Sequence, residues 1–253
     1  MKKQNLLFFP LLLGMGIGVF SCNIGSNPGN YQNFTNTPAV VDQRTDMGGI
    51  VIGTPWGYLA APELIDVYPG DCIYLYQFTI DYDNQPSDKY YTATSISKDN
   101  VDQSNIEVVA SDSIDLGDYI LPISGVSSMA DEFFLGRLFV GMSCKDKNPS
   151  FRLVYNTKGE ATNGIKNLYL QAGPSSSTAS TADVAAIHAF NLLSFIQQYG
   201  GDTTKTFKGS ADKFDFKFIK ANLNYVSAVT DGKPAYTMMN SPSNPIEIYV
   251  FKN

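Results

Sequence analysis

Histidine, cysteine and basic residues are scarce in this sequence. Its 253 residues include one His and three Cys, and 18 Lys plus Arg are outnumbered by 24 Asp plus Glu. The net charge of −6 argues against DNA or RNA as a partner, because neutralising phosphates requires a basic face. A single His, dispersed Cys and the lack of a glycine-rich phosphate loop predict no metal site, no cofactor and no catalytic residue.

Apolar residues, in contrast, are plentiful. Hydrophobic residues make up 43% of the chain and aromatic residues 13%, which is enough to build a core and excludes a disordered chain. No Gly-X-Y or heptad repeat indicates a fibrous protein. The length fits one large or two ordinary globular domains.

Residues 1–21 have the pattern of a lipoprotein signal peptide. Lys2 and Lys3 precede an apolar run over residues 6–20, which is shorter than the roughly 20 residues of a spanning helix. The run ends in Val19-Phe20-Ser21-Cys22, which resembles the lipobox of bacterial lipoproteins. We therefore predict a bacterial cell-envelope protein, bound to the membrane through a lipid on Cys22, at the periplasmic face or surface of the outer membrane. The alternative is an ordinary secretory signal in which Cys22 is incidental.

Residues 22–46 precede the first periodic apolar pattern. Asn, Gly, Pro, Ser and Thr dominate this stretch, and few apolar residues could nucleate a core. We predict a flexible tether. Loss of the two signal-peptide lysines leaves 18 − 2 = 16 basic against 24 acidic residues, and such a surface is repelled by anionic head groups.

A first β-domain is predicted over residues 47–114. Short β-rich runs at 48–54, 56–61, 71–82 and 89–97 are separated by turn signals, without helices between them. The third run has a period of two, which places on one face Cys72, Tyr74, Tyr76, Phe78, Ile80 and Tyr82. Its turns on either side favour a hairpin with the fourth run. This spacing of short strands predicts an OB-like barrel.

A second block of strands is predicted from about residue 115 to the end. The strand candidates are 133–144, 150–155, 165–172, 213–221 and 246–251. The segment 182–199 is ambiguous. Ala186, Ala189, Phe190, Leu193 and Ile196 have helical spacing, but a short apolar run cannot be assigned by periodicity alone.

The order and spacing of these segments resemble those of the NigD-like lipoproteins. The similarity lies in the lipobox, in a Pro-Gly-Asp…Tyr-Leu-Tyr-Gln-Phe strand at 69–78, and in Phe133-Phe134-Leu135-Gly136-Arg137-Leu138-Phe139. Further runs at 151–155, 167–170 and 190–195 keep the order of the family. The resemblance covers nearly all of residues 46–253 and implies an OB-type domain, a C-terminal β-sandwich and no known function. It also implies a strand at 187–192, whereas the stretches 173–183 and 241–245 have no counterpart.

The predicted fold class is thus all-β, with a small OB-like barrel followed by a β-sandwich domain. The domains are the signal peptide (1–21), the tether (22–46), the barrel (47–114) and the sandwich (115–253).

Candidate chemical sites are few, and a structural explanation is favoured for each. His188 is the only imidazole, and its chain neighbours include neither a nucleophile nor an orienting carboxylate. Asp81-Tyr82-Asp83-Asn84-Gln85 has the oxygen spacing of a calcium loop, but Pro86 stands where that loop needs glycine. Cys72 and Cys144 lie in apolar runs and are expected to be buried thiols, with a disulfide as the alternative.

Tyrosine, at 15 residues, is the one abundant resource for binding. Trp56, Tyr58, Tyr90 and Tyr91 could stack on sugar rings, although tyrosine is also a common structural residue of β-sheets.

The leading hypothesis is a non-catalytic envelope lipoprotein, a binding or adaptor module for an unknown protein or glycan. One alternative is a carbohydrate-binding surface lipoprotein beside an outer-membrane importer, which needs several exposed aromatic rings in one plane. Another is a pilus-like structural subunit, which needs an exposed edge strand. An enzyme is the least favoured, because it would need paired carboxylates that no spacing predicts.

Overall fold

The computed structural model describes residues 30–55, 57–85, 90–129, 132–133, 135–159, 164–175, 179–206 and 213–251. The predicted signal peptide and Cys22 lie outside these residues. Strands account for 67% of the structure and helices for 6%, which confirms the predicted all-β class. Within the described ranges no helix has the length and apolar character needed to cross a membrane.

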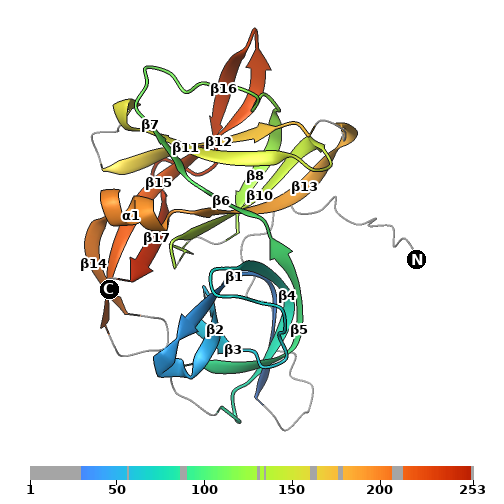
Figure 1. The fold of residues 1–253 in the computed structure, drawn as a ribbon, viewed down its shortest axis with the longest axis vertical. Helices are drawn as coiled ribbons and strands as arrows, with labels where there is room; N and C mark the ends of the chain where they lie inside the picture. Colours follow the sequence, from blue (N-terminus) through green and yellow to red (C-terminus); the bar gives the residue numbers. More distant parts are fainter. Residues whose placement is uncertain are drawn as a thin grey trace.

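The first domain is a closed barrel of five strands, at the bottom of Figure 1. The strands are β1 (Tyr31–Arg44), β2 (Gly49–Thr54), β3 (Gly57–Ala60), β4 (Cys72–Asp81) and β5 (Tyr91–Val101). They are joined in the order β1-β2-β3-β5-β4, with β3 and β5 parallel and the other neighbours antiparallel. This is an OB-type barrel, and β4 and β5 form the expected antiparallel pair.

β1 occupies most of the segment predicted as a tether. It pairs with β4 from Tyr31 to Val40 and with β2 from Val40 to Arg44. Ala39, Val40 and Val41 are almost fully buried. The tether prediction is therefore wrong for residues 31–44. The Asn and Thr residues of this segment give no strand signal. The barrel cannot close without a strand between β4 and β2, however, and this pairing overrides the local propensity.

A β-bulge in β4 reverses the predicted face of Tyr76. The register against β5 shifts between Leu75 and Gln77, so the alternation changes parity there. The barrel core takes Ile73 and Leu75 before the bulge and Phe78 and Ile80 after it. Tyr76 is left 43% exposed, with its hydroxyl 2.9 Å from Asp99. The prediction that Tyr76 lies on the same face as Phe78 and Ile80 is therefore wrong.

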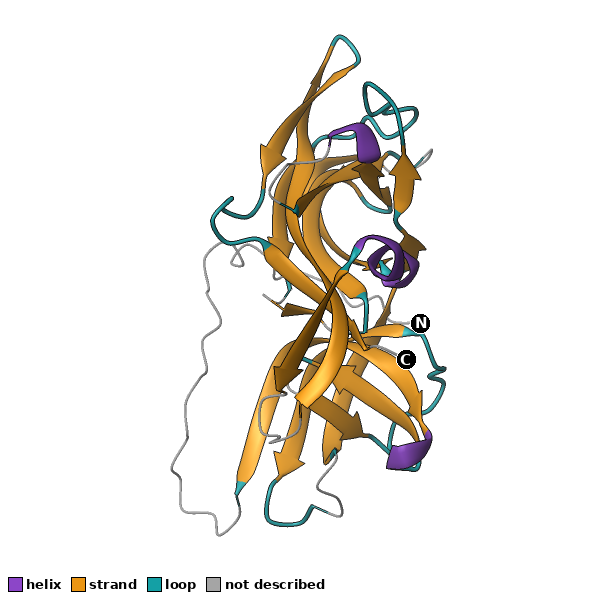
Figure 2. Ribbon diagram, turned by 90° about the vertical axis from the view of Figure 1, so that its left-hand side faces the viewer, coloured by secondary structure: helices purple, strands orange, loops and turns teal. Residues whose placement is uncertain are grey.

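The rest of the chain forms two facing sheets, seen from two directions in Figures 1 and 2. One has the order β6-β13-β10-β8; the other has the order β7-β11-β12-β15-β17-β9, and β14 and β16 also pair with β15. The strands are β6 (Gln103–Asn105), β7 (Glu107–Val109), β8 (Ile123–Ser128), β9 (Glu132–Phe133), β10 (Arg137–Asp146), β11 (Ser150–Asn156), β12 (Ile165–Gly173), β13 (Ala179–Asn191), β14 (Gly201–Thr206), β15 (Lys213–Thr230), β16 (Lys233–Met238) and β17 (Ile246–Phe251). Apolar residues from both sheets share one core, as in a β-sandwich.

The boundary between the domains lies earlier than predicted. β5 ends at Val101, and the chain continues directly into β6 and β7. β6 pairs with β13 in the small sheet, and β7 pairs with β11 in the large sheet. The stretch 103–109 therefore belongs to the sandwich, and the predicted boundary after residue 114 is wrong. Strands of three residues are too short to show a period.

The ambiguous segment 182–199 contains both kinds of structure. β13 runs to Asn191, so the strand implied by the family resemblance is present. Helix α1 (Leu193–Tyr199) follows at once and buries Phe195 and Ile196. The helical prediction is thus confirmed only for its last third.

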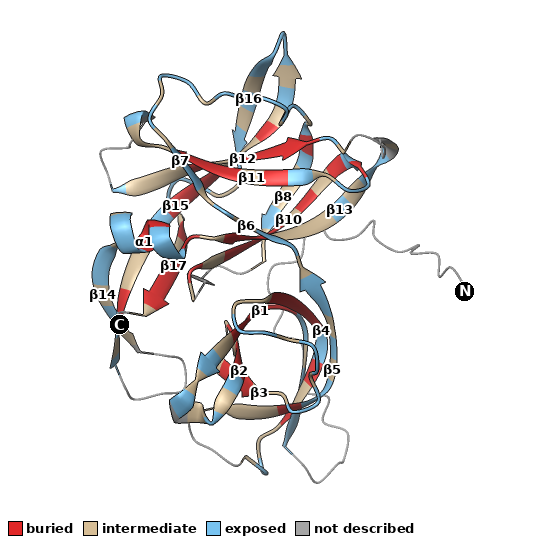
Figure 3. Ribbon diagram, viewed as in Figure 1, coloured by how far each residue is buried: buried red, intermediate tan, exposed pale blue. Residues whose placement is uncertain are grey.

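Barrel and sandwich are packed together along an apolar junction. Val40 of β1 and Cys72 of β4 belong to the core of the sandwich rather than to that of the barrel. The guanidinium of Arg44 also lies 5.6 Å from the ring centre of Phe251 on β17. Figure 3 shows buried strand segments in both domains. The two domains therefore share part of one core.

Removal of β1 tests this architecture. We expect a chain that starts at residue 30 to fold, and a chain that starts at residue 45 to lose the barrel. Burial of Val40 and Val41 alone contributes about 3–6 kcal/mol, which a marginally stable protein cannot lose. Urea unfolding followed by circular dichroism would measure the difference. Equal urea midpoints for the two chains would contradict the role given to β1.

Candidate functional site

A polar pocket of about 360 Å³ opens where the barrel meets the sandwich. The residues lining it are Pro69, Gly70 and Asp71 before β4, Gln103, Ser104 and Asn105 of β6, Arg137 of β10 and Asn191 of β13. Most of these side chains carry amide, hydroxyl or charged groups. The pocket thus differs from the largely apolar clefts that bind most drug-like ligands, although its volume is in the usual range of roughly 300–1,000 Å³.

Arg137, the first residue of β10, supplies the positive charge of this pocket. Its Nη1 donates to Oδ1 of Asn191 at 2.7 Å and to the carbonyl oxygen of Leu135 at 3.3 Å. Its Nε is buried and has no hydrogen-bond acceptor among the described residues. None of the ion pairs among the described residues includes Arg137. Within the part of the chain that the structure describes, the site therefore holds a partly buried cation without a carboxylate partner.

A glycine turn fixes the position of Arg137. Leu135 and Gly136 both have left-handed backbone, with φ of 61° and 64°. The N–H of Gly136 donates to the carbonyl of Tyr249, and its carbonyl accepts from the N–H of Leu192. A Cβ at Gly136 would lie 2.9 Å from Val250 Cγ2 and 3.2 Å from Leu193 Cα, so a larger residue requires its neighbours to shift. The turn thus anchors the start of β10 between β17 and α1.

Gln103 connects the two domains beside the pocket. Its Nε2 donates to the carbonyl of Gly70 at 3.0 Å, and the thiol of Cys72 donates to its Oε1 at 3.5 Å. Burial raises the pKa of Cys72 to about 11, although Arg137 acts in the opposite direction. The thiol is therefore protonated and unreactive at neutral pH. Cys72 and Cys144 are both free and buried, as expected for apolar core thiols.

His188 lies at the edge of the sandwich core and has a partner that its chain neighbours did not reveal. Its Nε2 is 3.0 Å from the hydroxyl of Ser104, and its ring contacts Phe151 and Phe190. Burial lowers the pKa of His188, and the charge of Asp102 opposes this without a hydrogen bond. The parallel pairing of β6 with β13 brings Ser104 to His188, and nothing in the order of the chain signals it.

The aromatic residues predicted to stack on a ligand are buried or half-buried wherever the structure describes them. Trp56 lies outside the described residues. Tyr58 is only 9% exposed, and its hydroxyl donates to Asp42 at 3.2 Å. The guanidinium of Arg44 covers its ring at 5.3 Å from the centroid. The prediction of Tyr58 as a ligand-stacking residue is therefore wrong.

Tyr90 and Tyr91 are half-buried, and Tyr91 packs edge-on against Tyr82 with ring centres 5.3 Å apart. Tyr91 thus stabilises the barrel instead of presenting a free face. Tyr68, by contrast, is 68% exposed and directly precedes Pro69 of the pocket. Tyr68 gives no signal in the sequence, because a single tyrosine in a turn has no period.

The segment 81–85 is a turn in which the carboxylate of Asp81 accepts hydrogen bonds from residues of the same segment. Oδ2 of Asp81 accepts from the side chain of Asn84 at 2.6 Å, and Oδ1 accepts from the backbone N–H of Asp83 at 3.1 Å. Within the described residues no group of three His, Cys, Asp or Glu side chains is placed to hold a metal ion. The geometry agrees with the turn that the sequence favoured.

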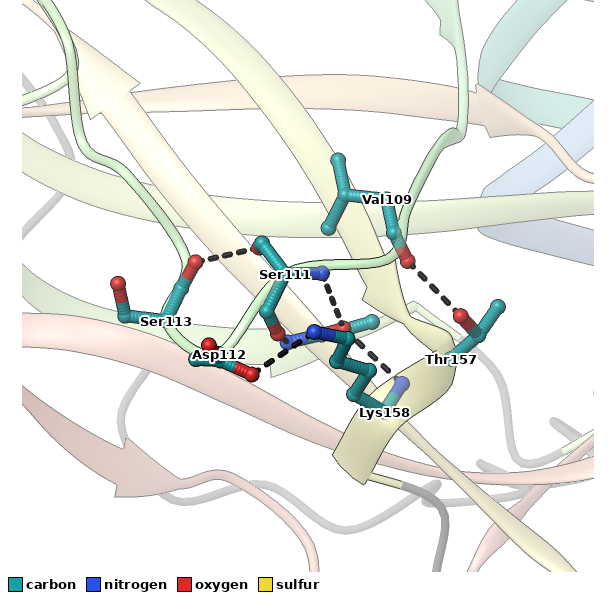
Figure 4. A network of polar contacts seen from close by, with 7 residues as sticks. Val109, Ser111, Asp112, Ser113, Thr157 and Lys158 are labelled. Carbon is teal, nitrogen blue, oxygen red and sulfur yellow. Dashed lines mark hydrogen bonds and ion pairs between the residues drawn. The ribbon is translucent and has the colours of Figure 1, made fainter.

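A separate polar network holds the chain after β7 against the end of β11 (Figure 4). The Asn156 side chain donates to the carbonyl of Ser111 at 2.8 Å, and Thr157 donates to the carbonyl of Val109 at 3.2 Å. Lys158 forms an exposed ion pair with Asp112 at 2.8 Å. These contacts keep β6 and β7 in place after the chain leaves the barrel, and β6 lines the pocket.

Fold and site together define an all-β protein with an OB-type barrel, a β-sandwich and a polar pocket between them. No family model and no curated protein matches the sequence. An uncharacterized protein from Parabacteroides merdae has a similar structure, with a TM-score of 0.60 at 16% identity over 86% of this chain and 99% of its own. A protein of unknown function from Bacteroides vulgatus aligns with a TM-score of 0.53 at 14% identity over 83% and 92%.

A NigD-like immunity protein from Bacteroides caccae also matches, with a TM-score of 0.43 at 14% identity over 84% of this chain and 93% of its own. At these identities the two structures with TM-scores of 0.60 and 0.53 show a shared fold alone. An OB-type barrel followed by a β-sandwich is the architecture that the resemblance to the NigD-like lipoproteins implied.

The half-buried imidazole of His188 predicts a pH-dependent stability. Because the folded-state pKa of His188 is lowered, the unfolded chain binds a proton more readily below about pH 6.5. Stability should therefore fall as the pH decreases through this range, by at most about 1.4 kcal/mol per pH unit. Urea unfolding at about pH 7.5 and about pH 5.5 should show a smaller loss in His188→Gln than in the wild type. An identical loss in both proteins would contradict this assignment.

The turn before Arg137 offers a matched pair of substitutions. Gly136 and Gly232 both have positive φ, but only Gly136 has neighbours where a Cβ would lie. We expect Gly232→Ala to cost about 1 kcal/mol from backbone strain, and Gly136→Ala to cost about 2–4 kcal/mol because crowding is added. Thermal or urea unfolding would measure both. Equal costs would show that the crowding at Gly136 relaxes freely.

Proposed function

We propose that this protein is a lipid-anchored, non-catalytic binding protein of the bacterial outer membrane, with its ligand site in the pocket between barrel and sandwich. The observation that carries this proposal is Arg137, a partly buried cation that lacks a carboxylate partner among the described residues. Keeping such a charge costs stability unless a bound group compensates it. A ligand that supplies the missing negative charge provides that compensation.

The placement of the pocket supports a binding role. Its residues come from the turn before β4, from β6, and from the facing ends of β10 and β13. No single domain therefore contains the complete site. Ligand sites often lie at such domain interfaces, because two rigid surfaces position the polar groups.

The surroundings of the pocket favour binding over catalysis. Among the described residues Asp71 is the only carboxylate that lines it, whereas the usual glycosidase mechanism requires two carboxylates about 5–9.5 Å apart. The Ser104–His188 pair borders the sandwich core, and His188 has no hydrogen-bonded carboxylate among the described residues. A serine nucleophile needs a base that a third group orients.

The anchor fits a protein held close to the membrane. Only residues 23–29 separate Cys22 from Asn30, where the described structure begins. Fully extended, these seven residues reach at most about 25 Å. The barrel would therefore stand near the lipid head groups, much closer than a tether of two dozen residues would allow.

Lipidation at Cys22 provides the direct test of this proposal. Cells expressing the full chain should incorporate labelled palmitate into the protein, and Cys22→Ser should abolish the label and release the protein from the membrane fraction. Cys144→Ser is the matched control and should retain the label, because Cys144 lies in the core. A wild-type protein that takes up no label would contradict the lipid anchor.

A further inference from the structure

We infer that the junction pocket binds the carboxylate and hydroxyl groups of a sugar acid, a hexuronate or a similar carboxylated monosaccharide unit. This inference rests on the proposed binding function and adds the chemical class of the ligand.

The carboxylate requirement comes from Arg137. A guanidinium presents its N–H groups in a planar fork that matches a carboxylate in two-point contact. One Nη of Arg137 is already held by Asn191 and the Leu135 carbonyl, which fixes the orientation of the group. Arg137 lines the pocket, and its hydrogen bonds to described residues use Nη1 and leave Nη2 available, so the guanidinium is pre-positioned to bind an oxygen anion.

The hydroxyl requirement comes from the other polar residues. Gln103, Ser104, Asn105 and Asn191 line the same pocket and offer both donors and acceptors. Paired amide and hydroxyl groups match the hydroxyls of a sugar, each of which donates and accepts. Some of these side chains already have one partner within the protein, but an apolar ligand would displace water from the donors and acceptors that remain, which costs about 1–3 kcal/mol for each group that it buries.

Asp71 limits the charge of the ligand. Its carboxylate lines the pocket, and its Oδ2 also accepts from the backbone N–H of Tyr68 at 2.8 Å. With one positive and one negative side chain, the pocket disfavours a dianion such as phosphate more strongly than a ligand with a single negative charge. They suit a ligand with one carboxylate and several hydroxyls, since Asp71 can accept hydrogen bonds from those hydroxyls.

Tyr68 adds a surface for the sugar ring. It is 68% exposed and adjoins the pocket through Pro69. An exposed tyrosine beside polar groups presents an apolar ring face together with a polar hydroxyl, which is a favourable surface for the C–H face of a sugar. Tyr68 was not among the residues that the sequence offered for stacking, which were Trp56, Tyr58, Tyr90 and Tyr91.

The test compares acids with their neutral counterparts on the full chain in detergent. D-glucuronate and D-galacturonate are titrated by saturation-transfer NMR beside D-glucose, D-galactose, acetate and inorganic phosphate. We expect at least one of the two sugar acids to bind about tenfold or more tightly than its neutral counterpart, acetate and phosphate, the ratio that one charge-assisted hydrogen bond supports. Equal binding of the acid and neutral sugars, or no binding of either acid, would overturn the inference.

Substitutions then locate the site. Arg137→Gln should weaken binding of the acid by about tenfold or more and remove its advantage over the neutral sugar. Tyr68→Ala should weaken both sugars, with little effect on folding because the side chain is exposed. Lys233→Gln, which removes one positive charge on the distant β16, should bind like the wild type. If Arg137→Gln does not fold, Tyr68→Ala and Asn105→Ala decide the question.

Full acid binding in both Tyr68→Ala and Asn105→Ala, or in a folded Arg137→Gln, would place the site elsewhere and overturn the inference. Palmitate labelling and acid binding fail independently. A labelled protein that binds no sugar acid rejects this inference alone, whereas an unlabelled protein that binds one rejects the lipid anchor alone.

Discussion

The packing of the barrel against the sandwich is the constraint on which the rest of the structure depends. Val40 and Cys72 leave the barrel core and join the core of the sandwich. Burial of apolar side chains has no preferred direction by itself. Here it holds the barrel and the sandwich in one relative orientation, although their contact surfaces also carry polar groups. Once that relation is set, the turn at 69–71 faces β6 and Arg137, and the pocket exists. The polar groups at the pocket are therefore positioned by contacts that are mostly apolar.

Within the junction, polar groups fall into two kinds. Gln103 satisfies its hydrogen bonds across the domains, with Gly70 on one side and Cys72 on the other. Such satisfied groups stabilise one specific arrangement, because any displacement leaves them without partners. Arg137 is different, since it lines the pocket and forms no ion pair with any described residue. A pocket whose polar side chains are held in place but retain unused hydrogen-bonding groups is suited to binding a ligand. The entropy cost of orienting these side chains is then part of folding and does not weaken binding.

Much of the fold could be predicted, and the errors have physical causes. The runs that became β2, β4, β11, β12 and β17 are apolar or alternating, so they showed strand character by themselves. β1 was missed because its Asn and Thr residues favour turns, and its burial arises only from pairing with β4 and β2. Tyr76 was misplaced because a single-residue bulge inverts the alternation and leaves no local sign. The short β6 and β7 have too few residues for a period, and the pocket depends on β6.

The sequence by itself determined the all-β class, the signal-peptide pattern ending in Cys22 and the small number of chemical groups available. These properties depend on composition and on patterns within about ten residues, which the linear chain contains. Only the tertiary structure decided that Ser104 lies beside His188, that Tyr58 is covered by Arg44, and that Arg137 lines a pocket with residues from the barrel turn and β6. Each of these contacts depends on strand pairing or domain packing between distant segments of the chain. Arg44 and Tyr58 are 14 residues apart, and Ser104 and His188 are 84 residues apart. Such contacts follow from the closure of the barrel and from the joining of two cores, which no local pattern specifies.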